Sequence, residues 1–212
     1  MFNNGLSTYR RARIIGNLET VALINHDGVV DWCCLPHVES SSLFARLLDA
    51  EDGGHFTVQP ATPFEASHEY LDRTNVLETR FETTSGQATV TDFMSIPDIA
   101  EAHQVPQATV FRKLTCESGH VDMAVEFEPR FDYARTKPTV EEARHGVVAT
   151  SNEKEVFLSG SVPFSISDHA AHTSVALSEG ETRWLVLGHD QEIPIEPPHP
   201  SRDACRRHRL LA

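Results

Sequence analysis

Carboxylates are the side chains in this sequence whose spacing could most directly support chemistry. Glu126 and Glu128 lie two residues apart in a pattern typical of a strand, so both side chains are expected on one face, where a pair could act as general acid and base. That face alternates with an apolar one and is therefore expected to be solvated. Because a catalytic carboxylic acid needs a dry pocket that raises its pKa, we assign no catalytic residue to this pair.

The twelve histidines and four cysteines raise the question of a metal site. His169 and His172 have a spacing that would suit two ligands on one helix face, but the residues around them are typical of a strand and a turn, and no third ligand is evident. We expect exposed loop histidines there. No two cysteines are separated by two residues, and the adjacent Cys33 and Cys34 are expected to be buried as small apolar residues. The sequence predicts neither a metal site nor a cofactor.

Strand patterns dominate the segments that must position these groups. In residues 121–127 apolar side chains alternate with polar ones, which is the period of a strand with one buried and one solvated face. Residues 108–116 and 156–166 follow the same alternation, and the apolar run 184–187 predicts a central strand. Turn signals separate these segments at 27–28, 53–54, 85–86, 118–119, 145–146 and 179–180.

One helix is predicted, over residues 42–48. Ser42 could cap it, and an apolar stripe would follow, made of Leu43, Phe44, Leu47 and Leu48. Many short strands separated by turns, without strand–helix alternation, predict an all-β fold, a large antiparallel β-sandwich with this one short helix. We assign residues 1–190 to the sandwich domain and residues 191–212 to a Pro-rich linker and a short tail.

The charge balance narrows the class of partner. The formal net charge is −13, and an acidic surface repels nucleic acid and anionic membranes, so neither is an expected partner. Such a surface also keeps a protein in solution at high salt. We favour a salt-adapted source over the alternative, an acidic protein from a GC-rich genome. No apolar stretch approaches the roughly 18 residues of a membrane span, and the N-terminus lacks the apolar region of a secretory signal, so a cytoplasmic location is expected.

The most specific pattern lies between residues 15 and 60. It contains a strand (IGNL, 15–18, and TVALI, 20–24), an Asp-Gly turn, a second strand that ends in a proline (DWCCLP, 31–36), the segment FARLLD (44–49) and a Gly-Gly turn. Trp32 has two interpretations within this pattern. We favour an aromatic of the core or an interface, with its N–H satisfied, over a platform that stacks on a sugar.

This order of segments resembles the amino-terminal domain of glycoside hydrolase family 15, the glucoamylase and trehalase family, as found in its bacterial and archaeal glucoamylase-like and trehalase-like members. Later stretches are similar to the same domain: NVLETRF (75–81), VTDFM (90–94), PRFDYAR (129–135) and the closing strand at 184–187. The resemblance covers roughly residues 8–190. It implies a β-sandwich and a role in carbohydrate metabolism.

The chain departs from the family pattern in two places. The family commonly has Pro-Arg-x-Asp-Ser after the Trp strand, whereas residues 36–40 read Pro-His-Val-Glu-Ser, so any bidentate contact of that arginine is lost or changed. The family also continues from its linker into an (α/α)6 barrel, in which two glutamates are the general acid and base of an inverting mechanism. No part of this sequence is long or helical enough to be that barrel, so no catalytic residue is carried over.

The resemblance therefore implies an accessory domain, inactive by itself, whose partner is the (α/α)6 barrel of a glucoamylase- or trehalase-like enzyme acting on α-glucans or trehalose. The strand and loop over 31–40 are predicted to face that barrel or to contact sugar. The candidate residues are Asp31, Trp32, Pro36, His37, Glu39 and Ser40, with Arg130 and Asp132 as weaker candidates. The alternatives are a free-standing carbohydrate-binding module, and a structural partner that binds a separately encoded barrel or associates with itself.

Overall fold

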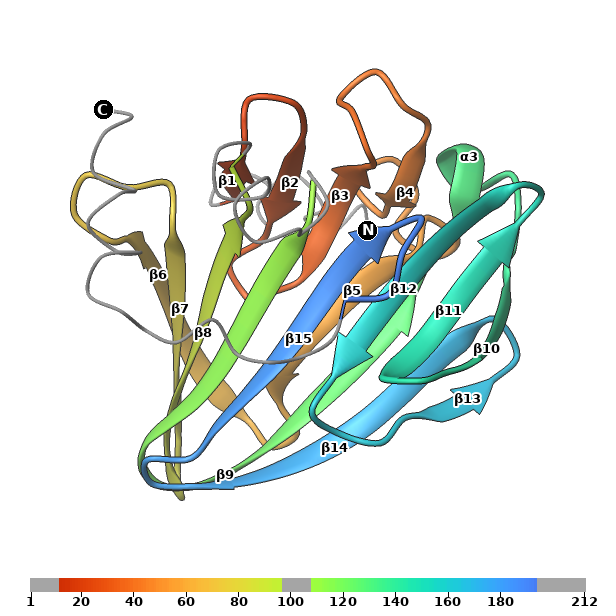
Figure 1. Ribbon diagram of the computed structural model, residues 1–212. Coiled ribbons are helices and arrows are strands. Elements are labelled where there is room, and N and C mark those ends of the chain that lie inside the picture. Colours follow the sequence, from red (N-terminus) through yellow and green to blue (C-terminus); the bar gives the residue numbers. More distant parts are fainter. Residues whose placement is uncertain (1–11, 97–107, 194–212) are drawn as a thin grey trace, which may run out of the picture.

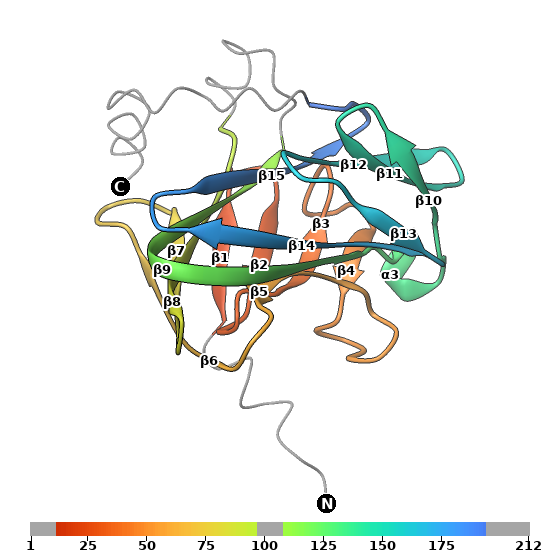
Figure 2. The same cartoon turned by 90° about the horizontal axis from the view of Figure 1, so that it is seen from below.

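The computed structural model describes residues 12–96 and 108–193, whose strands pair antiparallel in two groups that share the long strand β9 (Val110–Glu128) (Figure 1). The first group contains β1 (Arg13–Gly16), β2 (Val21–Ile24), β3 (Val30–Cys34), β4 (Ser42–Ala45), β5 (His55–Pro60), β13 (Ser165–Ser167) and β14 (Ala170–Ser178). The second contains β6 (Phe64–Tyr70), β7 (Leu77–Thr83), β8 (Gly86–Met94), β10 (Thr139–Ala143), β11 (Gly146–Ser151), β12 (Lys154–Gly160) and β15 (Thr182–His189). The short helix α3 (Phe131–Ala134) follows β9 and lies beside β4 (Figure 2).

Strand β9 connects the two groups because it changes partners along its length. Its first part pairs with β8 and β15, and from His120 onward it pairs with β14 and then β5. Gly119 stands at the change, with φ +70. The turn predicted at 118–119 is therefore wrong, because β9 continues through this position. Glycine adopts a positive φ without steric cost, so the strand can bend at Gly119 without ending.

The apolar core lies between the two groups. The rings of Phe44, Phe56 and Phe127 meet in the first group, with centroids 5.8–6.4 Å apart, and Phe81 and Leu114 of the second group belong to the same buried cluster. Burying one phenylalanine side chain contributes about 1.5–3 kcal/mol. One core shared by two antiparallel layers confirms the predicted all-β sandwich.

The alternation patterns identified most strands correctly. The apolar residues of 121–127 are buried and their polar neighbours face solvent, both within β9. Residues 184–187 lie in β15, which is central because it pairs with β9 on one side and β12 on the other. Cys33 and Cys34 are buried, as predicted for small apolar residues, and Cys116 is buried as well; all three are free thiols.

The helix predicted over residues 42–48 is wrong. Residues 42–45 form β4, which pairs with β3, and a turn follows. All four residues of β4 are buried, and a strand that is buried on both faces gives a continuous apolar run that a helix pattern also fits. The one helix within the described ranges is α3, and its residues Asp132 and Tyr133 have positive φ values of 54 and 58.

A buried ion pair ties the two layers together. Arg112 on β9 and Asp92 on β8 are cross-strand partners, both 0% exposed, with 2.8 Å between Arg112 Nε and Asp92 Oδ1. The guanidinium also donates hydrogen bonds to the carbonyl oxygens of Phe56 (2.9 Å) and Gly28, which belong to the other layer. All three guanidinium nitrogens of Arg112 and both carboxylate oxygens of Asp92 therefore have hydrogen-bond partners inside the core.

Several predictions fall on residues outside the described ranges, namely the Pro-rich segment from 194 onward, the C-terminal tail with Cys205, and the first eleven residues. In the part of the chain that the structure describes, no helix is long and apolar enough to cross a membrane.

Candidate functional site

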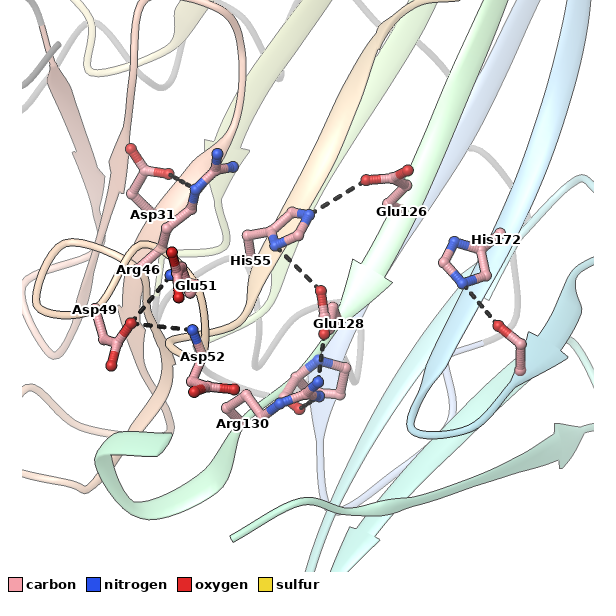
Figure 3. A network of polar contacts seen from close by, with 12 residues as sticks. Asp31, Arg46, Asp49, Glu51, Asp52, His55, Glu126, Glu128, Arg130 and His172 are labelled. Atoms are coloured by element: carbon pink, nitrogen blue, oxygen red, sulfur yellow. Dashed lines mark hydrogen bonds and ion pairs between the residues drawn. The ribbon is translucent and has the colours of Figure 1, made fainter. Parts of the chain in front are cut away.

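The first predicted site residue, Asp31, is buried on β3. Its Oδ2 accepts a hydrogen bond from Asn25 Nδ2 at 2.9 Å, and Arg46 Nε lies 4.0 Å from its Oδ1 (Figure 3). Its backbone carbonyl accepts the N–H of Leu47 at 3.2 Å. Asp31 therefore holds the β2–β3 and β4–β5 connections together.

Burial raises the pKa of the Asp31 carboxyl above its usual 3.8, although the Asn25 hydrogen bond and the Arg46 charge oppose that shift. Because the folded state then binds the proton more tightly than the unfolded chain, Asp31 makes stability fall as the pH rises from 3.8 through the raised pKa. We expect Asp31→Asn to remove this contribution. Urea unfolding of both proteins from below pH 3.8 to neutral pH should show wild type losing stability relative to the variant. A constant difference across that range would contradict the assignment.

Trp32 follows Asp31 on β3, so its side chain lies on the opposite face of the strand, and it is half-buried. Its ring packs against Tyr133 of α3, with centroids 6.0 Å apart. A hydrogen bond from the Trp32 side chain to the Cys34 thiol partly offsets the burial that raises the pKa of that thiol. These contacts favour the interpretation of Trp32 as a packing aromatic with its N–H satisfied.

The predicted loop over 36–40 is closed by its own hydrogen bonds and contacts the β1–β2 connection. Pro36 follows a cis peptide bond, and the loop closes on itself because Ser40 N–H donates to the His37 carbonyl at 3.0 Å and His37 N–H to Ser40 Oγ at 3.2 Å. His37 and Glu39 are exposed. The Val38 N–H donates to the carbonyl of Glu19 in the β1–β2 connection, at 2.9 Å.

The two weaker candidates behave differently from each other. Arg130 is buried: its guanidinium pairs with Glu128 and donates to the Pro129 carbonyl at 2.9 Å, and its backbone N–H donates to Leu43 of β4. Asp132 is half-exposed on α3, and its Oδ2 lies 3.8 Å from Arg135 Nη1. The structure thus brings α3 to Trp32 and β4, whereas the 36–40 loop contacts the β1–β2 connection instead.

A polar pocket on the first group of strands was not anticipated from the sequence. His55 on β5 stands between two carboxylates of β9, with Nε2 3.3 Å from Glu126 and Nδ1 3.5 Å from Glu128 (Figure 3). The pocket beside it has a volume of about 410 Å³ and is lined by Asn25, Asp27, Val29, Arg46, Ala50, Glu51, His55, Thr57, Gln59 and Glu126. Only the register that sets His55 opposite Glu128 places these groups together, and no local pattern reveals that register.

The carboxylate pair that the sequence singled out lies on a partly solvated face of β9. The Glu126 and Glu128 side chains are 50% and 31% exposed and face a histidine, not each other across a dry cavity. Within residues 12–96 and 108–193, no group of three or more His, Cys, Asp or Glu side chains is placed to hold a metal ion. His169 and His172 instead contact the Pro138 carbonyl and the Ser167 hydroxyl, at 2.7 and 3.0 Å.

Comparison with known proteins identifies the family. The family model described as trehalase-like, N-terminal, matches residues 3–202. The chain is 30% identical to the trehalase of Thermoplasma volcanium over 176 residues, which is 81% of this chain and 28% of that protein. It is 28% identical to the trehalase of Thermoplasma acidophilum over 170 residues (77% and 28%) and 26% identical to that of Mycobacterium tuberculosis over 201 residues (85% and 29%).

The chain thus spans less than a third of the length of these curated relatives. The match nevertheless covers nearly the whole of its own sequence, including every strand of the sandwich. The chain belongs to the trehalase-like N-terminal domain family.

Proposed function

We propose that this chain is the accessory N-terminal domain of a trehalase-like enzyme of glycoside hydrolase family 15, and that it hydrolyses no sugar by itself. The observation that carries the proposal is the match over residues 3–202 to an N-terminal domain whose curated relatives are trehalases about three times as long. Its partner would be the catalytic (α/α)6 barrel, and trehalose or a starch-type oligosaccharide would be the substrate of the whole enzyme.

The carboxylates of the described residues support an inactive domain. An inverting glycosidase needs two carboxyl groups about 6.5–9.5 Å apart across a site that admits sugar and water. The two buried carboxylates, Asp31 and Asp92, each face an arginine, and Asp92 lies in the closed core. Asp92 is thus closed off from sugar and water, and Asp31 is engaged by Asn25 and Arg46.

The purified chain is expected to release no glucose above background from trehalose, maltose or maltotriose. The assay needs the full-length Thermoplasma volcanium trehalase as a positive control on trehalose, and this chain denatured by heat as the background. Glucose release that rises in proportion to the concentration of the native chain would overturn the proposal of an inactive domain.

One observation favours a second function, carbohydrate binding. Phe93 and Phe111 stack with centroids 5.0 Å apart, and Trp184 meets Phe93 edge-on, so an aromatic cluster lies on adjacent strands outside the main core. A sugar-stacking surface requires exposed aromatic rings on one sheet face, and in this cluster Phe111 is buried while Phe93 and Trp184 are partly exposed. Calorimetric titration of the chain with the same three sugars distinguishes the two functions, because binding that Trp184→Ala abolishes would favour the carbohydrate-binding module.

A further inference from the structure

The outward faces of the two layers differ in their chemistry, and strand β9 shows the difference because it belongs to both. In its second part the outward side chains include Asp122 and Glu126, both half-exposed. In its first part the outward side chain of Phe111 is only 8% exposed. The outward face of an antiparallel sheet is ordinarily polar and solvated. The first layer follows that pattern, and the second layer departs from it.

The departure is an apolar cluster on three adjacent strands of the second layer. Phe93 on β8 is the cross-strand partner of Phe111, and Phe111 is also the partner of Val186 on β15. The rings of Phe93 and Phe111 stack nearly parallel, at an interplanar angle of 10°, and Trp184 of β15 meets Phe93 with centroids 6.3 Å apart. These side chains pack together in a cluster that is separate from the main core.

The apolar face continues onto a fourth strand, β12. Phe157 is the cross-strand partner of Gly188, and Gly188 lies two residues beyond Val186, so Phe157 and Val186 lie on one face. Phe157 is partly exposed, as Phe93 and Trp184 are. We define the outer patch as Phe93, Phe111, Phe157, Trp184 and Val186. Apolar side chains that follow one another across four neighbouring strands are typical of a face that another surface covers.

The last described residue lies on the outer patch. Ile193 is 7% exposed and packs with Phe111 and Val186. It can approach the backbone of β15 because residue 188 is a glycine, where a Cβ would lie 2.8 Å from Ile193 Cδ1. Glu192 is held as well, since its Oε1 accepts a backbone N–H from the β10–β11 turn. The segment that leads out of the sandwich is therefore fixed on this face.

We propose that the outer patch is the surface through which this domain docks on the catalytic part of its enzyme. The inference rests on the proposed function and adds the surface. The match to an N-terminal domain covers 28–29% of the curated relatives, so most of such an enzyme follows the segment that Ile193 holds on the patch. A partner tethered there meets the patch at a high effective concentration. Its complementary surface is expected to be apolar at the centre.

The test is calorimetric titration of this chain into the catalytic part of Thermoplasma volcanium trehalase, prepared without its matching N-terminal region and first shown to be folded by cooperative thermal unfolding. Trp184→Asp and Phe157→Asp are each expected to weaken association about tenfold or more, because a carboxylate would be buried against an apolar surface. The matched control is Leu18→Asp, since Leu18 is 89% exposed in the β1–β2 connection of the other layer. It should bind like wild type.

The thermal midpoint of each isolated variant, followed by circular dichroism, separates docking from folding. Trp184→Phe keeps an aromatic ring in the patch and should bind close to wild type, and Phe157→Asp decides the question if Trp184→Asp does not fold. The outer patch is wrong if a folded aspartate variant binds like wild type, or if Leu18→Asp weakens binding equally.

Two other results would reject the assignment in different ways. A wild-type chain that does not bind the folded catalytic part overturns the proposed function itself. A dimer of the chain that Phe157→Asp dissociates, with no effect of that variant on binding to the catalytic part, assigns the outer patch to self-association and leaves the proposed function standing.

Discussion

Asp92→Ala is expected to destabilise the domain by about 3–5 kcal/mol, because it leaves the Arg112 guanidinium charged and without its counterion inside the core. Both side chains are fully buried, and Arg112 also donates hydrogen bonds to the carbonyls of Phe56 and Gly28 in the other layer. The arginine cannot move into solvent without giving up these contacts. Urea unfolding followed by circular dichroism at neutral pH measures the loss.

The matched control for this buried pair is an ion pair at the surface. Glu78 Oε1 lies 3.1 Å from Arg80 Nη2, with the arginine 47% exposed. Exposed pairs of this kind contribute about 0–1 kcal/mol, so Glu78→Ala should cost little. If Asp92→Ala destabilised the domain no more than Glu78→Ala, Arg112 would not depend on Asp92 and the role of the pair as a link between layers would be refuted.

Gly119→Ala is the substitution with the second largest expected effect, a loss of about 3 kcal/mol in the free energy of unfolding. Gly119 has φ +70, and a Cβ there would overlap the Ser85 carbonyl oxygen and the Gly86 Cα on β8. The left-handed backbone costs about 1–2 kcal/mol, and displacing the neighbours adds about 1–2 kcal/mol. The change also distorts β9 where it crosses between the two layers.

Gly180→Ala separates backbone strain from overlap. Gly180 has a similar φ of +83, but nothing lies within 4 Å of the position that its Cβ would occupy. This variant should therefore lose only the cost of the left-handed conformation, about 1–2 kcal/mol. Equal losses for the two variants in the same denaturant series would show that the close approach of β8 to Gly119 has no energetic consequence.

The sequence predicts strands well where one face is buried and the other is wet. The alternation over 121–127 fulfils that condition, and its residues are buried as expected. Prediction from the sequence fails for Ser42–Ala45, which is buried on both faces. A continuous apolar run has no periodicity that could distinguish a strand from a helix. Prediction also fails at Gly119, where the same glycine that ends many strands lets this one bend and continue.

The candidate site was predictable only in part, since local sequence does not encode contacts between distant strands. The motif at 31–36 was identified, but the partners of Asp31 come from Asn25 and Arg46 on other connections. Arg112 shares the parity of buried residues in 108–116, yet the sequence does not show that Asp92 neutralises it. His55 and its carboxylates likewise meet only through strand register.

The most direct test of the central claim is glucose release from trehalose by the catalytic part of Thermoplasma volcanium trehalase, measured without this chain and with increasing amounts of it. The account predicts no release by the chain alone, and activity of the catalytic part that rises and saturates as the chain is added. Release of glucose by the chain alone, or activity of the catalytic part that is the same at every concentration of the chain, would contradict an accessory role.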